Sequence, residues 1–342
     1  MNNIQILSLF AGLFLLVACQ NTQPVAEQPK SGSDSLTIAF YNVENLYDVT
    51  DDPKTQDEDF TPEGKYKWTA DRYAQKLQKL AEVFDAMPGE LPAFIGMVEI
   101  ENRNVLEDLV KENLLSKGNY GIIHQDSPDE RGIDVAAIYD KKRLNIEDYQ
   151  YIKIVLPDST DRTRDMLYVK AKVKNETIHF FVNHWPSRRG GQSESEISRI
   201  TVANILKSEI EKIKSADTQA KILCMGDFND HPVDKSIAEV LNAGIQKDNT
   251  LYNYMYTAHT SGQGTYYYKG EWGALDQFIA TKTLQEATTG WKSTSSDAHI
   301  FNPDLVMFQD DKGLKRPNRT YVGEDYKGGY SDHLSIYIVL RR

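Results

Sequence analysis

Seven short apolar runs, rich in β-branched and aromatic residues, constrain most strongly what this chain can fold into. They lie at 36–42, 94–100, 133–139, 177–185, 221–227, 275–280 and 333–340. Runs of this length and composition are typical of strands, and the more continuous ones indicate strands covered on both faces. Apolar residues with helical spacing lie between them, at 73–84 and 197–213. This alternation predicts an α/β protein.

The length of the chain suits one large domain or two ordinary ones. It has 342 residues, of which 40% are hydrophobic and 26% are charged. No repeat occurs at a fixed period, and the only compositionally biased segment lies near the N-terminus. We therefore expect a single domain over residues 36–342.

The N-terminus has the pattern of an export signal. An apolar run at 4–18 is too short to span a membrane comfortably and ends next to Cys19. The residues "LVAC" resemble a bacterial lipobox, in which the cysteine is lipidated after cleavage. We expect a signal peptide at 1–18, a lipid anchor on Cys19 and a flexible tether at 19–35. The alternatives are an ordinary signal peptide and a short buried helix, and "MNN" lacks the basic residues usual before such a run.

A lipid anchor would hold the protein in the cell envelope, outside the cytoplasm. Gln20 carries no inner-membrane retention signal of the enterobacterial kind, which favours the outer membrane. We expect the anchor to be the only contact with the membrane, and the protein to be a monomer. Cys224 is the only other cysteine, so no disulfide framework is possible, and its apolar strand indicates a buried thiol.

The charge of the chain limits the kinds of partner it can bind. A formal net charge of −11 argues against a general surface for polyanions. It does not exclude a nucleic acid or phosphate substrate, because a site that binds a divalent cation carries its own positive charge. Any affinity for phosphate would then be local and metal-dependent.

Polar residues that could take part in catalysis or metal binding lie at the ends of the predicted strands. Asn42, Glu99, His184 and Asp227 end their runs, whereas Asp276 and His333 stand at or near the beginnings of theirs. If the last two strands run antiparallel to the others, these ends and beginnings meet at one edge of the sheets. The sequence therefore predicts one cleft that contains all six side chains.

Six short motifs, taken in this order, carry a resemblance to a known family. They are "FYNVEN", "GMVEIEN", "NHWPSRRGG", "GDFND", "ALDQF" and "YSDH". Together they resemble the endonuclease/exonuclease/phosphatase superfamily, which includes pancreatic deoxyribonuclease, AP endonucleases, neutral sphingomyelinases and inositol polyphosphate 5-phosphatases. The resemblance spans residues 36–340 and implies an α/β four-layer sandwich, in which two packed mixed β-sheets are flanked by helices.

The carboxylates of the predicted cleft point to a metal ion. If they gather in one place they repel one another, so some must bind protons unless a cation is present. Oxygen ligands suit Mg²⁺, with Mn²⁺ or Ca²⁺ possible, better than zinc. The resemblance implies that Glu99 is the central ligand, helped by Asn42 and Asp332, with Glu44 as a second acidic residue nearby. The alternative for Glu99 is a surface glutamate on a loop.

Asp227 and Asn229 lie two positions apart at a strand end. In-line attack of water on a phosphate ester needs a carboxylate to align or deprotonate the water. It also needs a neutral donor to hold the charged phosphoryl oxygens, and this pair would supply both. The alternative is a tight turn in which both side chains bind local backbone groups.

Two histidines complete the predicted catalytic set. The resemblance implies that His333 contacts the phosphate and is oriented by Asp276. It also implies that His184 stabilises the transition state or protonates the leaving oxygen, tasks that suit an imidazole near neutral pH. Asp134 is a weaker candidate to orient His184.

Three arginines and one acidic segment are candidates for substrate selection. Arg188 or Arg189, in the loop after His184, would form a phosphate clamp, unless the loop is only solvated. Arg131 is a weaker case of the same kind. The acidic segment 48–68 is either a rim of the site that repels long polyanions or a surface insertion, and we favour the insertion.

Together these features predict a metal-dependent phosphoric ester hydrolase. We expect a phosphodiesterase, most specifically a nuclease that hydrolyses extracytoplasmic DNA or RNA by in-line attack of water. The first alternative is a phosphomonoesterase or a lipid phosphodiesterase of the sphingomyelinase type, because substrate choice resides in loops. The alternative of another class is a non-catalytic surface lipoprotein that binds a partner.

Overall fold

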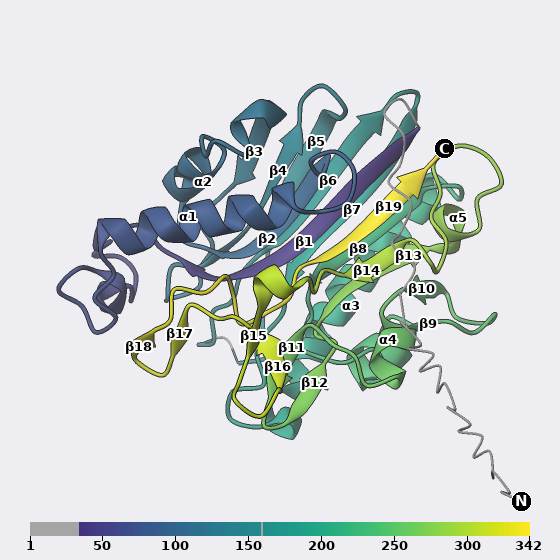
Figure 1. Cartoon of the computed structure of the whole chain (residues 1–342). Helices are drawn as coiled ribbons and strands as arrows, with labels where there is room; N and C mark the ends of the chain where they lie inside the picture. The colour runs from purple at the N-terminus through teal and green to yellow at the C-terminus, as the bar shows by residue number, and fades with distance from the viewer. Residues whose placement is uncertain (1–33, 159) are drawn as a thin grey trace, which may run out of the picture.

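Two large mixed β-sheets pack face to face at the centre of the molecule (Figure 1). The computed structural model describes residues 34–158 and 160–342. The predicted signal peptide, the lipidation site at Cys19 and most of the predicted tether therefore lie outside the described residues. Among the described helices, none combines the length and the apolar character needed to cross a membrane.

The first sheet has six strands, in the order β14-β19-β1-β2-β4-β3. Its long central strands β1 and β2 are parallel, and β19 runs antiparallel to β1. The bounds of the six strands are Ser35–Leu46 for β1, Phe94–Ile100 for β2, Tyr120–His124 for β3, Asp134–Asp140 for β4, Ala298–Ile300 for β14 and Ile336–Arg341 for β19.

The second sheet has seven strands, in the order β5-β6-β7-β8-β13-β10-β9. The strands β7 and β8 are parallel, and β13 runs antiparallel to β8. The bounds are Asn145–Ile152 for β5, Met166–Val173 for β6, Glu176–His184 for β7, Lys221–Asp227 for β8, Ala243–Gly244 for β9, Leu251–Asn253 for β10 and Asp276–Thr281 for β13. The expected antiparallel direction of the last two central strands is thus observed in both sheets.

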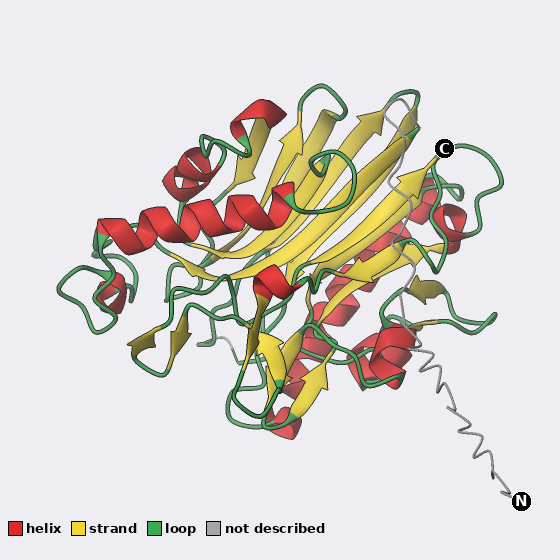
Figure 2. Ribbon diagram, in the orientation of Figure 1, coloured by secondary structure: helices red, strands yellow, loops and turns green. Residues whose placement is uncertain are grey.

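Helices cover the outer faces of both sheets (Figure 2). The helices α1 (Ala70–Asp85) and α2 (Arg103–Leu109) pack on the first sheet, and α3 (Gln192–Ala216) packs on the second. Apolar side chains at helical spacing on α3, namely Val202, Leu206 and Ile210, face the sheet and are buried. The predicted four-layer α/β sandwich is therefore confirmed.

The core between the sheets is apolar and aromatic. Phe94 of the first sheet stacks on Phe180 of the second with ring centroids 4.5 Å apart. Both side chains have no exposed surface, as expected of strands covered on both faces. Burial of these rings fixes the distance between the sheets and hence between the strand ends that carry the polar residues.

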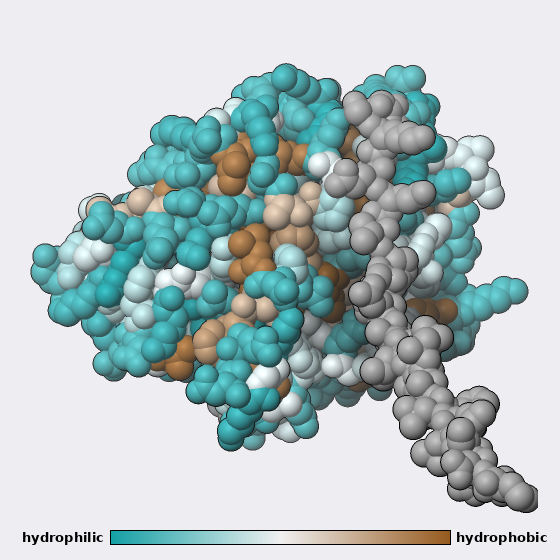
Figure 3. All heavy atoms as spheres, in the orientation of Figure 1, coloured by the Kyte–Doolittle hydropathy of each residue, from teal (hydrophilic) through white to brown (hydrophobic). Residues whose placement is uncertain are grey.

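Shorter elements surround one edge of the sandwich. Three two-stranded hairpins lie along the lower edge in the view of Figure 1: β11–β12 (Tyr266–Tyr268, Glu271–Gly273), β15–β16 (Met307–Gln309, Lys315–Pro317) and β17–β18 (Tyr321–Val322, Asp325–Tyr326). The helices α4 (Tyr256–Thr260) and α5 (Lys282–Gln285) are short, as are the helical turns at Glu58–Phe60, Ser116–Gly118, Ser236–Val240 and Asp304–Val306. The face seen in Figure 3 is mostly hydrophilic, with apolar residues in small patches.

The last predicted strand begins later than expected. The apolar run starts at residue 333, whereas β19 begins at Ile336. The backbone of His333 pairs instead with Tyr266 in the β11–β12 hairpin, and the backbone N–H of Leu334 donates to the carbonyl of Thr265. The hairpin thus holds His333 at the mouth of the sandwich rather than in the ladder of β1.

Candidate active site

The ends of five strands bring polar side chains from distant parts of the chain together. Asn42, Glu99, His184 and Asp227 lie at or near the carboxyl ends of β1, β2, β7 and β8, and Asp276 begins β13. In the second sheet His184 and Asp276 lie directly opposite Asp227, one on each neighbouring strand. The predicted cleft is therefore present, and antiparallel pairing is what brings Asp276 to it.

His333 is held in place by Asp276. Its Nδ1 lies 2.7 Å from Asp276 Oδ2, and its Nε2 lies 3.8 Å from Asp227 Oδ2. Burial opposes protonation, but the carboxylates of Asp276 and Asp227 prevail and raise the pKa of His333 well above its usual value. His333 is therefore an imidazolium that donates to Asp276 and directs its other N–H into the cleft. This is the orientation expected of a phosphate-binding histidine.

Asp227 is buried and carries bonds on both carboxylate oxygens. Oδ1 accepts from the backbone N–H of Asn229 at 2.9 Å, and Oδ2 accepts from the side-chain amide of Asn42 at 3.1 Å. Burial raises the pKa of Asp227, and the charge of His333 opposes this shift. A carboxylate with a raised pKa accepts a proton more readily, which suits a base that aligns and deprotonates water.

Asn229 forms the tight turn considered as its alternative role, and its role as a donor to the phosphate stays a prediction. Its backbone is left-handed, with φ of 49°, and forms a turn closed by the bond to Asp227. Its side-chain amide nitrogen donates to the carbonyl of Trp185 at 3.0 Å. The turn thereby ties the end of β8 to the residue after His184, and keeps the amide at the floor of the cleft.

His184 is neutral and has a free ring nitrogen. Its Nε2 lies 4.0 Å from Glu99 Oε1 and 3.9 Å from Asp227 Oδ2. Burial, followed by the charges of Arg164 and Arg131, lowers its pKa well below the usual value. Among the described residues, no group forms a hydrogen bond with its buried Nδ1.

The expected partner of His184 is bound elsewhere. Asp134 accepts from the backbone N–H of Ser127 at 2.7 Å, and its other oxygen lies 2.9 Å from Nε2 of His124. The prediction that Asp134 orients His184 is therefore wrong. β4 runs antiparallel to β2, so Asp134 comes to the same edge, but its side chain turns to the neighbouring strand β3.

Glu99 stands at a kink that turns its carboxylate into the cleft. Its backbone is left-handed, with φ of 65°, where β2 loses register with both neighbours. Its Oε1 lies 3.3 Å from the amide nitrogen of Asn42, and its Oε2 accepts from the backbone N–H of Asn45 at 2.9 Å. A strained backbone at a non-glycine residue is frequent at functional sites.

Asn42 connects the carboxylates rather than offering them its oxygen. Its amide nitrogen donates to both Glu99 and Asp227, while its oxygen accepts from the backbone N–H of Glu44. The amide oxygen keeps a second lone pair, so the expectation that Asn42 is a metal ligand stays a prediction. Asn42 links the residue expected to bind a metal to the residue expected to align water.

Glu44 and Asp332 meet at a side chain that sequence analysis missed. The guanidinium of Arg319 donates to Asp332 at 2.9 Å, and its Nε lies 3.6 Å from Glu44 Oε1. Glu44 also accepts from the backbone N–H of Thr320 at 2.6 Å. Burial raises the pKa of both carboxyls, and their mutual repulsion adds to the shift of Glu44.

Lys76 is a second missed cation. It lies on α1 with almost no exposed surface and donates to the hydroxyl of Thr320 at 2.7 Å and to the carbonyl of Tyr330 at 2.6 Å. Burial lowers its pKa to about 8. The sequence carried a signal, because Lys76 falls on the apolar face of its helix with Leu77 and Leu80.

The residues on this side of the cleft fit a hard divalent ion. Glu99, Asp332 and Glu44 offer only oxygen atoms. Burial is the main cause of the raised pKa values of Glu44 and Asp332, and the negative charge of a neighbouring carboxylate adds to each shift. Two other groups of described residues each have ligand atoms within 4.8 Å of one another: Asp227, Asp276 and His333 in the cleft, and His124, Asp126 and Asp134 beside it. The resemblance implies that the ion lies on the side of Glu99, and this assignment stays a prediction.

The three arginines proposed as phosphate contacts differ in how they are held. Arg188 is committed to the carbonyl of Asn229 and to Asp230 and Asp234, at 2.7, 3.1 and 2.5 Å. The expectation that Arg188 clamps a phosphate is therefore corrected: it fixes the turn after β8. Arg189 is exposed. 

Arg131 remains a candidate substrate contact. It makes a bidentate ion pair with Asp129, with both distances 3.2 Å, and its side chain is 47% exposed. Its charge acts on both Glu99 and His184. The guanidinium therefore lies at the mouth of the cleft in a fixed orientation.

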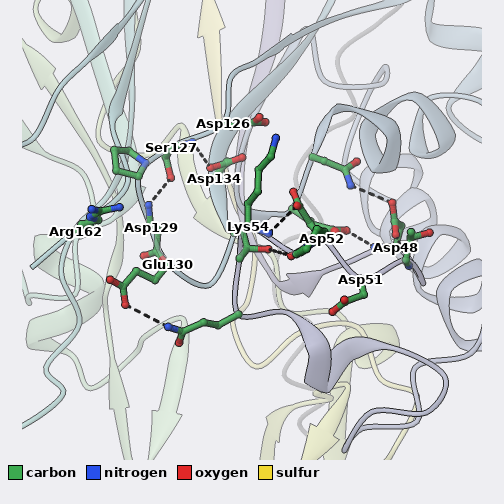
Figure 4. Close-up of a pocket in the computed structure, with 18 residues that line it drawn as sticks. Asp48, Asp51, Asp52, Lys54, Asp126, Ser127, Asp129, Glu130, Asp134 and Arg162 are labelled. Atoms are coloured by element: carbon green, nitrogen blue, oxygen red, sulfur yellow. Dashed lines mark hydrogen bonds between the residues drawn. The ribbon is translucent and has the colours of Figure 1, made fainter.

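An acidic cavity of about 810 Å³ opens beside the cleft (Figure 4). Two segments, one from the predicted acidic insertion and one before β4, carry most of its carboxylates on opposite sides. Eight acidic and two basic residues line it: Asp48, Asp51, Asp52, Glu101, Asp126, Asp129, Glu130 and Asp134, with Lys54 and Arg162. The insertion thus borders a cavity, and its role as a rim of the site stays a prediction.

A smaller cavity of about 260 Å³ lies on the other flank of the same insertion. It is bordered by Phe60, Tyr66 and Tyr321, by Arg319, and by Glu44 of the metal side. The rings belong to a cluster that packs around the buried Trp68. The insertion thus forms an acidic wall on one side and an aromatic wall on the other.

Known structures share this arrangement of strands and helices. Humanized TDP2 of D. rerio superposes with a TM-score of 0.58 at 14% identity, over 91% of this chain and 100% of that one. The human Nocturnin catalytic domain, with a bound sulfate anion, gives 0.54 at 15% identity, over 90% and 94%. A mannosyl-6-phosphatase of Bacteroides thetaiotaomicron gives 0.55 at 12% identity, over 90% and 100%.

The sequence comparisons identify a family for this chain but no similar curated protein. No curated protein matches this chain at a significant level. A family model described as "Endonuclease/Exonuclease/phosphatase family" matches residues 37–342, nearly the whole described part of the chain. With the shared fold and the gathered strand-end residues, this match shows that the chain belongs to the endonuclease/exonuclease/phosphatase family.

Proposed function

We propose that this protein is a divalent-metal-dependent hydrolase of phosphate esters, with a nucleic acid phosphodiester as its first candidate substrate. The observation that carries the proposal is the meeting of Glu99, Asp227 and His333 at one cleft from three distant parts of the chain. An acceptor for the proton of water, an imidazolium and a hard anionic ligand are the groups that in-line attack on phosphorus requires. The similar structures include a phosphatase, which supports this class of reaction.

The chain's own residues divide the work as follows. Asp227 aligns the attacking water and accepts its proton, since its carboxylate is held by Asn42 and Asn229. His333, fixed by Asp276, donates from Nε2 to a phosphoryl oxygen and stabilises the charge that develops there. Neutral His184, on the opposite side of Asp227, donates to the same group or to the leaving oxygen.

Glu99, Asp332 and Glu44 would hold the ion. When bound, a divalent cation supplies a Lewis acid that neutralises charge on the phosphate ester. Their three carboxylates repel one another, and the positive charges of Arg319 and Lys76 relieve only part of that repulsion.

A second candidate function is hydrolysis of a small phosphomonoester. The acidic cavity beside the cleft favours it, because eight carboxylates at the rim repel a long polyanionic strand. The ion pairs of Arg188 point the same way, since they remove one of the cations that a nucleic acid backbone would use. The predicted lipid anchor at Cys19 would place either reaction outside the cytoplasm.

One panel of substrates tests both candidates. Plasmid DNA, RNA, sphingomyelin, inositol phosphates and hexose phosphates would be incubated with the full described domain in Mg²⁺, Mn²⁺ or Ca²⁺, and in EDTA. We expect hydrolysis of at least one ester that stops in EDTA and returns when the ion is restored. Hydrolysis that persists in EDTA, or no hydrolysis of any ester with any ion, would contradict the proposal.

A further inference from the structure

The aromatic cavity is joined directly to the metal side of the cleft. Glu44 and Asn45 border it, and the backbone N–H of Asn45 donates to Glu99. Arg319, also at its border, is paired with Asp332 of the cleft. A molecule whose phosphate lies over Glu99 would therefore have the cavity within reach of its next few atoms.

The size of the cavity sets the size of its occupant. Its volume is about 260 Å³, which is below the range of roughly 300–1,000 Å³ typical of sites for drug-sized ligands. This is room for one ring and its substituents. Gly323 lies at the border with φ of 63°, and a Cβ at that position would meet no atom within 4 Å. The cavity therefore has an open side.

The geometry of the rings favours a puckered ring over a flat one. Phe60 and Tyr66 meet at 35° with centroids 4.7 Å apart, and Tyr66 and Tyr321 meet at 58° with centroids 4.9 Å apart. Rings inclined in this way leave no parallel slot in which a nucleobase could stack on two faces. They do offer apolar surface to the C–H groups of a sugar ring.

The charge at the cavity favours a neutral occupant. Arg319 is its only cation, and the carboxylates of Glu44 and Asp332 already compensate it. A second phosphate would find no unpaired positive charge there. The remaining donor capacity of Arg319, whose side chain is 39% exposed, suits the hydroxyl groups of a sugar.

We propose that this cavity binds the sugar ring of a phosphorylated sugar, with Tyr66 as the apolar contact and Arg319 as a hydrogen-bond donor to ring hydroxyls. The inference rests on the proposed function, since it places the alcohol part of the ester whose phosphate reacts in the cleft. Tyr66 is a specificity-determining residue in this account and takes no part in the chemistry.

The test compares two esters that share a primary alcohol. Hexose 6-phosphates carry a ring, and glycerol 3-phosphate does not; their methyl diesters serve the same purpose if the enzyme cleaves only diesters. We expect Tyr66→Ala to raise KM for the hexose ester about tenfold and to leave kcat/KM for the glycerol ester unchanged. Tyr268→Ala is the matched control, because Tyr268 is 59% exposed on the neighbouring β11 and does not border the cavity.

A second variant covers the case in which Tyr66→Ala does not fold. Gly323→Asn would extend a side chain from the open border, and asparagine tolerates a left-handed backbone better than other residues. We expect the same selective rise in KM for the hexose ester. Equal losses on both esters, or no change on the hexose ester, would overturn the proposal.

A binding measurement separates this proposal from the proposed function. Saturation-transfer NMR with hexose 6-phosphate in EDTA detects the sugar without hydrolysis. If no ester is hydrolysed but the sugar signal is present and is lost in Tyr66→Ala, the subsite stands while the proposed function fails. If the wild-type protein hydrolyses esters but gives no sugar signal, the subsite is overturned alone.

Discussion

The floor of the cleft, which comprises the strand-end residues around Asp227, and its two walls, which line the acidic and the aromatic cavity, are built in different ways. On the floor, buried side chains from five strands and the turn before β19 hold one another in place, so Asp227 contacts groups more than 100 residues away. The walls come from local segments: the insertion at 48–68 contributes to both cavities, residues 126–134 complete the acidic one, and residues 319–323 complete the aromatic one. From this contrast we propose that the fold fixes the chemistry, whereas local segments select the substrate.

The largest effects are expected on the floor. Asp227→Asn and His333→Gln should each lower kcat about 10³-fold or more on every ester that is cleaved, because they remove the base and the charge that stabilises the transition state. Steady-state kinetics with circular dichroism measures this. Asp311→Asn, at an exposed turn, makes the same chemical change as Asp227→Asn and serves as control. If a floor variant loses activity on one ester only, the proposal that the floor carries the chemistry common to all esters is contradicted.

Substitution of Asp230, three residues after Asp227, should affect stability rather than activity. Asp230 is buried, with Arg199 at 2.7 Å and Arg188 at 3.1 Å, and Arg199 has no exposed surface. Asp230→Asn leaves a buried arginine without its charge partner, and should lower the free energy of unfolding by about 3–5 kcal/mol. Urea denaturation measures this change. Asp227→Asn should not reproduce it, and an equal loss of stability in both variants would contradict the assignment.

The histidine after Asp230 should make stability depend on pH. Burial and the charge of Arg188 lower the pKa of His231 to about 4, while Asp234 opposes this shift and the stacked His259 adds to it. The unfolded chain takes up a proton near pH 6.5 and the folded chain does not, so stability falls as pH drops from about 6.5 towards 4. 

His231→Gln removes this pH dependence. The difference in unfolding free energy between wild type and His231→Gln should shift by about 1–2 kcal/mol over that pH window. Denaturation at pH 7.5, 6 and 5 measures the shift. A difference that stays constant with pH would show that His231 titrates normally.

The smallest expected effect lies at the acidic wall. Asp51 and Asp126 border the acidic cavity, and their carboxylates accept none of the described side-chain hydrogen bonds. The double variant with asparagine at both positions should raise kcat/KM for an oligonucleotide two- to fivefold at low salt, an order-of-magnitude estimate for two screened charges. The gain should vanish at high salt and be absent for a small ester. An equal gain on both substrates would mean that the wall does not select by charge.

Local sequence patterns predicted much of the fold, but they did not predict which strands pair with one another. Apolar runs predicted β1, β2, β4, β7, β8, β13 and β19, but not the interior strand β6. The positions of Asp276 and His333 predicted the antiparallel strands that bring them to the cleft. The start of β19 was missed because His333 pairs with a hairpin, and strand pairing is not encoded in a run of residues.

The candidate site shows the same limit at the level of single side chains. Asp134 and Arg188 were assigned to the cleft by their place in the sequence, yet each turns to a nearer partner of opposite charge or hydrogen-bonding capacity. Arg319 was invisible because its two carboxylate partners, Glu44 and Asp332, come from opposite ends of the chain. Lys76 alone carried a readable signal, as a charge on the apolar face of a helix.

The central claim is that the floor gathers carboxylates around one hard ion that hydrolysis requires. Calorimetric titration of Mn²⁺ or Mg²⁺ into the wild-type protein, Glu99→Gln and the exposed control Glu63→Gln tests it most directly. The account predicts saturable binding in wild type and Glu63→Gln, and at least a tenfold weaker affinity in Glu99→Gln, on the order of 1.4 kcal/mol. Binding of equal strength in all three proteins, or none in the wild type, would contradict it.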